Sequence, residues 1–123
     1  MDKTKFFTPT KIKNFLSCKY IVYNEFYKKD LGISKKQKTK NDELRLKKGN
    51  DHEDNYFLQL KKKYKKTIDL KKNNLDYSKR FKETLMAMQD GYEVIRGGVL
   101  IQEDWVGETD FLIKTTDLKS KFG

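Results

Sequence analysis

The sequence predicts an α+β domain, in which amino-terminal helices pack on a small, mainly antiparallel sheet. Apolar residues follow a helical period over most of residues 8–90, whereas after Gly91 they recur at every second position. A length of 123 residues fits a single domain, residues 1–123, and an aromatic content of 13% favours a folded chain over a disordered one.

Two helices are predicted before residue 30. Thr8 is a suitable N-cap, and Pro9 suits the first helical position because its missing N–H and fixed φ cost nothing there. Apolar residues at helical spacing resume over about 19–29, which predicts a second helix or a kinked continuation of the first. Residues 30–41 lack this period and concentrate Lys, Ser, Thr and Gly, which predicts a loop.

A long helix is predicted over about 42–65. Its largely apolar stripe is formed by residues at multiples of four, which share one face: Leu44, His52, Tyr56, Leu60 and Tyr64. The only histidine, His52, is therefore expected to point towards the core.

The second half of the chain combines a short strand, a helix and a hairpin. Segment 67–70 predicts an early strand, and 77–90 predicts a helix that Gly91 ends in the left-handed conformation. Alternating apolar residues in 92–101 and 104–114 predict two antiparallel strands. The turn between them is expected at Gln102, Glu103 and Asp104.

The formal net charge is +10, from 28 basic and 18 acidic residues, and such an excess attracts phosphate backbones. Nearly all the basic residues are lysines, and only three are arginines, so base-specific recognition is less expected. A lysine-rich surface that is merely solvated is the other interpretation of the same excess.

Cysteine content and apolar patterning restrict the class of protein. Cys18 is the only cysteine, so the chain cannot form an internal disulfide, a cysteine-based zinc site or a four-cysteine cluster. The amino terminus does not resemble a signal peptide, and no window approaches the roughly 20 apolar residues of a membrane span. We therefore expect a cytoplasmic protein without a membrane partner.

Glu108 and Asp110 lie two residues apart in the second predicted strand of the hairpin, and Asp110 has apolar neighbours. A carboxylate removed from water costs several kcal/mol unless a cation compensates it. That cation is either a hard divalent metal ion or one of the many lysines. Glu108, nearer the turn, is the weaker candidate, and a lone histidine such as His52 is by itself more typical of a core residue than of a ligand.

Four segments in this order resemble the start of a RecB-like nuclease of the PD-(D/E)XK superfamily: TPTKIKNFLSCKYIVY, KKGNDHE, ETLMAMQDGYEVIRGGVLI and WVGETDFLIK. The resemblance extends over roughly residues 7–114. It implies an incomplete restriction-endonuclease-like core and the hydrolysis of DNA phosphodiester bonds. It also implies that further nuclease or helicase domains can follow in the intact protein.

Two motifs carry this resemblance to the family. Gly49, His52 and Glu53 match a Gly-x-x-His-Glu helix segment, and Gly107 and Asp110 match a Gly-x-x-Asp strand. The resemblance implies that His52 and Asp110 bind Mg²⁺ or Mn²⁺ and are the catalytic residues. Glu53 is a further candidate for the same site.

The family also has a later strand with a Glu-x-Lys pair, and the sequence ends before such a strand, so this chain is expected to be inactive by itself. Cys18 alone cannot hold the iron–sulfur cluster of some relatives, and no such cluster is expected. A non-catalytic, basic nucleic-acid-binding module is the main alternative. A protein-interaction domain whose lysines reflect genome composition is a third hypothesis.

Overall fold

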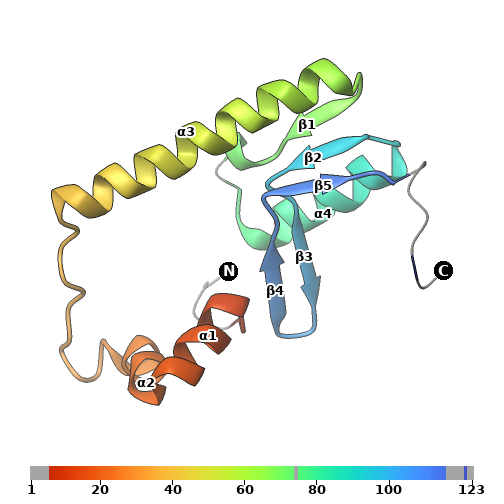
Figure 1. Ribbon diagram of the computed structural model, residues 1–123. Coiled ribbons are helices and arrows are strands. Elements are labelled where there is room, and N and C mark those ends of the chain that lie inside the picture. Colours follow the sequence, from red (N-terminus) through yellow and green to blue (C-terminus); the bar gives the residue numbers. More distant parts are fainter. Residues whose placement is uncertain (1–5, 74, 116–120, 122–123) are drawn as a thin grey trace.

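The computed structural model of the protein describes residues 6–73, 75–115 and 121 and has an α+β fold (Figure 1). Its helices are α1 (Pro9–Ser17), α2 (Lys19–Tyr27), α3 (Lys40–Lys63) and α4 (Tyr77–Gln89), with a short 3₁₀ helix, η2 (Lys71–Asn73). Its strands are β1 (Thr67–Asp69), β2 (Val94–Arg96), β3 (Val99–Gln102), β4 (Trp105–Glu108) and β5 (Phe111–Ile113). Within the described residues, no helix combines the length and the apolar character that a bilayer span requires.

The helices begin where side chains satisfy their first backbone N–H groups. Thr8 caps α1 by accepting a hydrogen bond from the Lys11 N–H, and Pro9 follows it as predicted. The extended backbone of Cys18 (φ −160°) then separates α1 from α2, so the amino-terminal segment forms two helices. Thr39 and Asp42 cap each other reciprocally at the start of α3, and this capping box explains why α3 begins two residues before the predicted position.

A three-stranded sheet lies between α3 and α4. β2 is its central strand, parallel to β1 and antiparallel to β5. Side chains alternate along β2, so Val94 packs against Phe57 and Leu60 of α3, while Ile95 packs against Ala87 of α4. The two helices therefore cover opposite faces of the sheet, and each face has its own apolar cluster.

The hairpin predicted after Gly91 is confirmed, with its turn at Glu103 and Asp104, but its arms bend and belong to two sheets. β2 and β5 form its base in the three-stranded sheet, and β3 and β4 form its tip as a separate two-stranded sheet. The pairing register is the same on both sides of the bend. The predictions of one unbroken strand over 92–101 and another over 104–114 are therefore wrong.

The bend falls at Gly97 and Gly98 in one arm and at Thr109 and Asp110 in the other. Gly97 has a φ of +68°, which favours glycine, and a Cβ at this position would lie 2.8 Å from the Cβ of Lys71. Two backbone hydrogen bonds, from the Gly97 N–H to the Asp110 carbonyl and from the Thr109 N–H to the Gly98 carbonyl, keep the arms paired across the bend.

α4 fixes the bend through two side chains. The hydroxyl of Thr84, a fully buried residue, accepts a hydrogen bond from the Val99 N–H at 3.0 Å and donates one to the Arg80 carbonyl at 2.7 Å. Arg80 donates from Nη2 to the Gly97 carbonyl at 2.6 Å. Backbone groups of the bend that lack a strand partner are thus satisfied by the helix beneath them.

We predict that Thr84→Val lowers the free energy of unfolding by about 1–3 kcal/mol, because a shape-conserving change leaves the buried Val99 N–H without an acceptor. Urea denaturation measures the effect. Thr84→Ser is the control, since it keeps the hydroxyl and loses only a methyl group. A larger loss in the Ser variant than in the Val variant would mean that packing, and not the hydrogen bond, makes Thr84 important.

Candidate functional site

An open hollow of about 680 Å³ lies where α3 faces the bend of the hairpin. α3 contributes Arg45, Gly49, Asn50 and Glu53, and Asp110 lies opposite them at the bend. Lys38, in the loop before α3, also lines the hollow. Asp42, which caps the start of α3, lines it as well. The hollow therefore joins segments far apart in the sequence and combines three carboxylates with two cationic side chains.

Glu53 reaches the hollow because it follows Gly49 by four residues and so lies on the same face of α3. Both of its carboxylate oxygens accept hydrogen bonds from Lys71 Nζ, at 2.9 and 3.1 Å, and one also accepts from Arg96 Nε at 3.1 Å. Burial alone would raise the pKa of Glu53, but these hydrogen bonds and the two positive charges lower it below its ordinary value.

Arg96 is the centre of a charge cluster that holds Glu53, and we call it, with its carboxylate partners, the Arg96 cluster. Its side chain is only 7% exposed. Besides Glu53, its guanidinium contacts Asp54 at 2.6 Å and lies 3.6 Å from Asp69. Burial would lower the pKa of Arg96, yet the hydrogen bonds from its guanidinium to Asp54 and Glu53 and the charge of Asp69 raise it. The guanidinium also lies over the ring of Phe57.

The sequence interpretation did not identify Arg96 or Lys71 as residues near the site. A signal was present for Arg96, because a charged residue stands in the apolar strand segment "VIRGG" at the same parity as Val94. Period-two alternation puts such a residue on the buried face that α3 covers, where it needs carboxylate partners. Lys71 carried no comparable signal, since it is one of many lysines.

Asp110 is exposed and lies at the bend between β4 and β5, outside both strands. The expectation of a half-buried carboxylate within a strand is therefore wrong, and burial does not force Asp110 to find a cation. Its exposed side chain instead borders the hollow together with Glu53.

His52 is also exposed, which contradicts the prediction that it points towards the core. The predicted stripe is right at Leu60, which is buried, and at Tyr64, which packs against the same cluster. Before Leu60 the core face is one position away from it, since Phe57 is buried and Glu53 is partly buried. Successive residues differ by about 100° around a helix, which turns His52 to the flank of this face. His52 does not line the hollow that contains Asp110.

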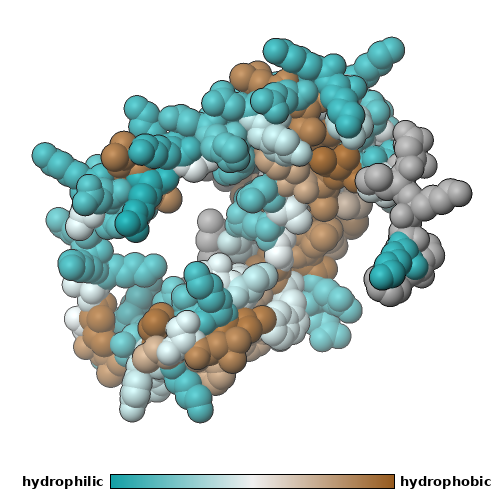
Figure 2. Space-filling view, in the orientation of Figure 1, coloured by the Kyte–Doolittle hydropathy of each residue, from teal (hydrophilic) through white to brown (hydrophobic). Residues whose placement is uncertain are grey.

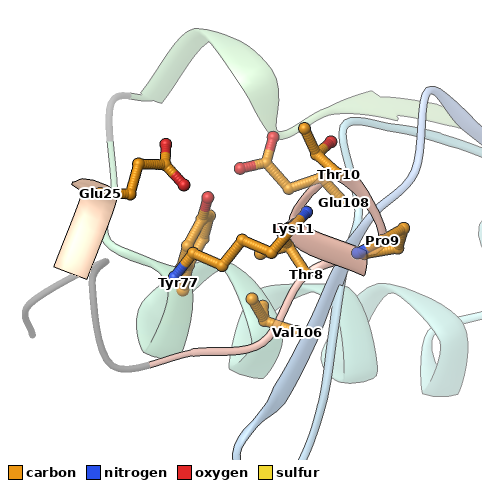
Figure 3. A pocket seen from close by; sticks show the side chains of 8 residues that line it. All are labelled: Thr8, Pro9, Thr10, Lys11, Glu25, Tyr77, Val106 and Glu108. Carbon is orange, nitrogen blue, oxygen red and sulfur yellow. Dashed lines mark hydrogen bonds between the residues drawn. The ribbon is translucent and has the colours of Figure 1, made fainter. Parts of the chain in front are cut away.

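Glu108 belongs to a different pocket, of about 450 Å³, formed by the start of α1, α2, α4 and β4 (Figure 3). Glu25 and Tyr77 line the same pocket, and Arg80 lies 3.7 Å from the Glu108 carboxylate. Burial and a hydrogen bond with Glu108 raise the pKa of Tyr77 to about 12. The structure thus separates Glu108 from Asp110, although only Thr109 stands between them in the sequence.

The donor set of the hollow suits a hard cation only in part. Among the described residues, no group of three or more His, Cys, Asp or Glu side chains is arranged to hold a metal ion. Mg²⁺, however, is commonly bound by one or two carboxylates and completes its shell with water and substrate phosphates. Glu53, Asp110 and Asn50 line the same hollow, and a pair of carboxylates with one amide is a donor set compatible with that mode of binding.

Comparisons with models of protein families, with curated proteins and with solved structures find no significant match to this chain. The resemblance to RecB-like nucleases therefore stays a prediction from the sequence. The chemistry of the hollow follows from its own polar residues, which are three carboxylates, an amide and two cationic side chains.

We predict that Arg96→Met lowers the free energy of unfolding by about 3–5 kcal/mol, because it leaves Glu53 and Asp69 without their buried counter-charge. Guanidinium denaturation at neutral pH measures this change. Arg45→Met is the matched control, since Arg45 is exposed on α3. It should change stability by no more than about 0.5 kcal/mol. Equal effects of the two substitutions would contradict a structural role of the Arg96 cluster.

The lowered pKa of Glu53 predicts a dependence of stability on pH. A carboxylate with a lower pKa in the folded state stabilises the protein above its unfolded pKa, and this contribution disappears as the pH falls through its folded pKa. We expect the wild type to lose stability below about pH 4 more steeply than Glu53→Gln does. Thermal unfolding scans from pH 7 to pH 3 measure this loss as the fall of Tm with pH. Asp51→Asn, an exposed change on the same helix, is the control and should show the same fall of Tm as the wild type.

Proposed function

We propose that this chain is part of a metal-dependent nuclease that hydrolyses DNA phosphodiester bonds, with the hollow between α3 and the hairpin bend as its site. One observation carries the proposal. Glu53, from the Gly-x-x-His-Glu match, and Asp110, from the Gly-x-x-Asp match, line the same hollow although 56 residues lie between them in the sequence. Two independent motif matches that meet at one place support a common role.

The carboxylates of Glu53 and Asp110 would hold Mg²⁺ or Mn²⁺, since both metals prefer oxygen ligands. Such a metal, when bound, polarises a phosphoryl oxygen and lowers the pKa of a coordinated water molecule. Lys38 and Arg45 line the same hollow and would attract the phosphate backbone without recognising bases. His52 remains a candidate ligand on the strength of the sequence alone, and its position on the flank of α3 does not add support.

Lys71 and Arg96 have the function of orienting Glu53 in this proposal. Their hydrogen bonds fix the Glu53 carboxylate at the wall of the hollow, and they offset its negative charge before any metal is present. A cation that binds Glu53 therefore competes with Lys71, whose side chain is 44% exposed and free to turn towards solvent. Metal binding is expected to be weak in the absence of nucleic acid, because phosphate oxygens would supply the remaining ligands.

A non-catalytic nucleic-acid-binding module is the second candidate function. It is favoured by the cationic partners that Glu53 already has, because these satisfy the carboxylate without a metal. Binding by such a module would be salt-dependent and unchanged by EDTA.

We predict that Asp110→Asn weakens Mn²⁺ binding by this chain roughly tenfold or more in the presence of a short DNA, because the substitution removes an anionic ligand. Isothermal titration calorimetry measures the affinity. Asp104→Asn, an exposed change at the tip of the hairpin, is the matched control and should bind as the wild type does. His52→Asn, tested alongside, assigns or removes the histidine as a ligand.

Cleavage is tested on the intact gene product, whatever its length, because the resemblance implies that a Glu-x-Lys strand completes the site. Mn²⁺-dependent cleavage of single- and double-stranded DNA should be lost in Asp110→Asn and kept in Asp104→Asn. Undiminished cleavage by Asp110→Asn would refute the proposed site, and DNA binding that ignores EDTA without any cleavage would favour the binding module.

A further inference from the structure

Three tyrosines of α2 form an exposed face that no described segment covers. Tyr20 is 75% exposed, Tyr23 51% and Tyr27 48%. Their spacing of three and four residues aligns them along one side of the helix, over a length of about 10 Å. The rings of Tyr23 and Tyr27 already lie near each other, with centroids 4.7 Å apart. We call these residues the tyrosine face.

A strongly basic segment follows the tyrosine face directly. Residues 28–39, which connect α2 to α3, contain five lysines and a single acid, Asp30. Every residue from Lys29 to Thr39 is exposed. We call this segment the lysine loop, and its last lysine, Lys38, lines the hollow with Glu53 and Asp110.

The lysine loop connects the tyrosine face to the hollow across open space. In Figure 1 the loop runs from the end of α2 to the start of α3, along the left side of the molecule. Figure 2 shows hydrophilic side chains interspersed with apolar ones on this side and over α1 and α2, and an opening between α3 and the amino-terminal helices. The loop therefore leads from the end of the helix that carries the tyrosine face to the start of α3.

We propose that the tyrosine face stacks the bases of a single-stranded nucleic acid, and that the lysine loop holds the backbone of that strand on its way to the hollow. This inference rests on the proposed function and names its substrate class. Proteins that bind single strands without sequence preference combine aromatic side chains for stacking with positive charge along the backbone, and both features occur here in consecutive segments.

The chemistry of the surface favours this occupant over others. The tyrosine face offers flat rings with polar hydroxyls, which suit stacking against bases, whereas the exposed Ile21 and Phe26 lie about a quarter turn or more away around α2. A double helix keeps its bases stacked internally and cannot present them to tyrosine rings, so a duplex would use only the charge. The shortage of arginine agrees with binding that does not depend on sequence.

Fluorescence anisotropy in EDTA at low salt tests the inference, with a labelled oligothymidylate of about 12 nucleotides and an abasic oligomer of the same length. We expect Tyr20→Ala to weaken oligothymidylate binding about tenfold and Tyr20→Phe to bind as the wild type does, because the ring stacks and the hydroxyl does not. The abasic oligomer should bind more weakly than oligothymidylate and should not respond to Tyr20→Ala.

Met86→Ala is the matched control, since Met86 is a large, 59% exposed residue on α4. It should leave both affinities unchanged. Equal affinity for the two oligomers, or oligothymidylate binding that is insensitive to Tyr20→Ala, would overturn the inference.

The anisotropy assay contains EDTA and no metal ion, whereas the cleavage assay requires Mn²⁺. The stacking surface and the nuclease activity can therefore fail independently. Tyrosine-dependent binding without any metal-dependent cleavage would retain the stacking surface and reject the nuclease. Cleavage of single strands that is lost in Asp110→Asn and kept in Tyr20→Ala, with unchanged KM, would retain the nuclease and reject the stacking surface.

Discussion

The buried guanidinium of Arg96 is the interaction on which the candidate site depends. It joins three elements, because its partners come from α3 (Glu53 and Asp54) and from β1 (Asp69), while Arg96 itself ends β2. A buried charge is tolerated only when hydrogen bonds and counter-charges compensate its desolvation, and three carboxylates do so here. The same contacts fix the rotation of α3 over the sheet, which determines that Glu53, and not its neighbour His52, faces the hollow.

The bend of the hairpin supplies the opposite wall. Gly97 and Gly98 let one arm turn sharply, and the other arm follows because backbone hydrogen bonds continue across the bend. Asp110 therefore lies outside the regular pairing, where its side chain is exposed beside α3. A straight hairpin would instead have put Asp110 within a strand, facing the same side as Leu112.

Several features could be predicted from local sequence because local chemistry decides them. Thr8 and Pro9 start α1, Gly91 ends the helix before the hairpin in the left-handed conformation, and alternating apolar residues mark the hairpin arms. The α+β class follows from the order of these signals. The exposed position of His52 could not be predicted in this way, because the apolar stripe of α3 was assigned from residues at multiples of four. The sheet is contacted by Leu60, which belongs to that stripe, and by Phe57, which does not. Glu53, Phe57 and Leu60 follow one another at spacings of four and three residues. The bend and the Arg96 cluster depend on contacts distant in sequence, so local sequence patterns do not predict them.

The pairing register that the two sheets of the hairpin share limits where the length of such a chain can change. One residue inserted into a single arm between Arg96 and Val99 would shift every pairing on one side of the bend and exchange the two faces of β5. Leu112 would then meet α3, and Phe111 and Ile113 would meet α4. Homologous chains should thus tolerate changes of length in the turn between Gln102 and Trp105. The number of residues between Gly97 or Gly98 and the paired strands on either side should stay constant.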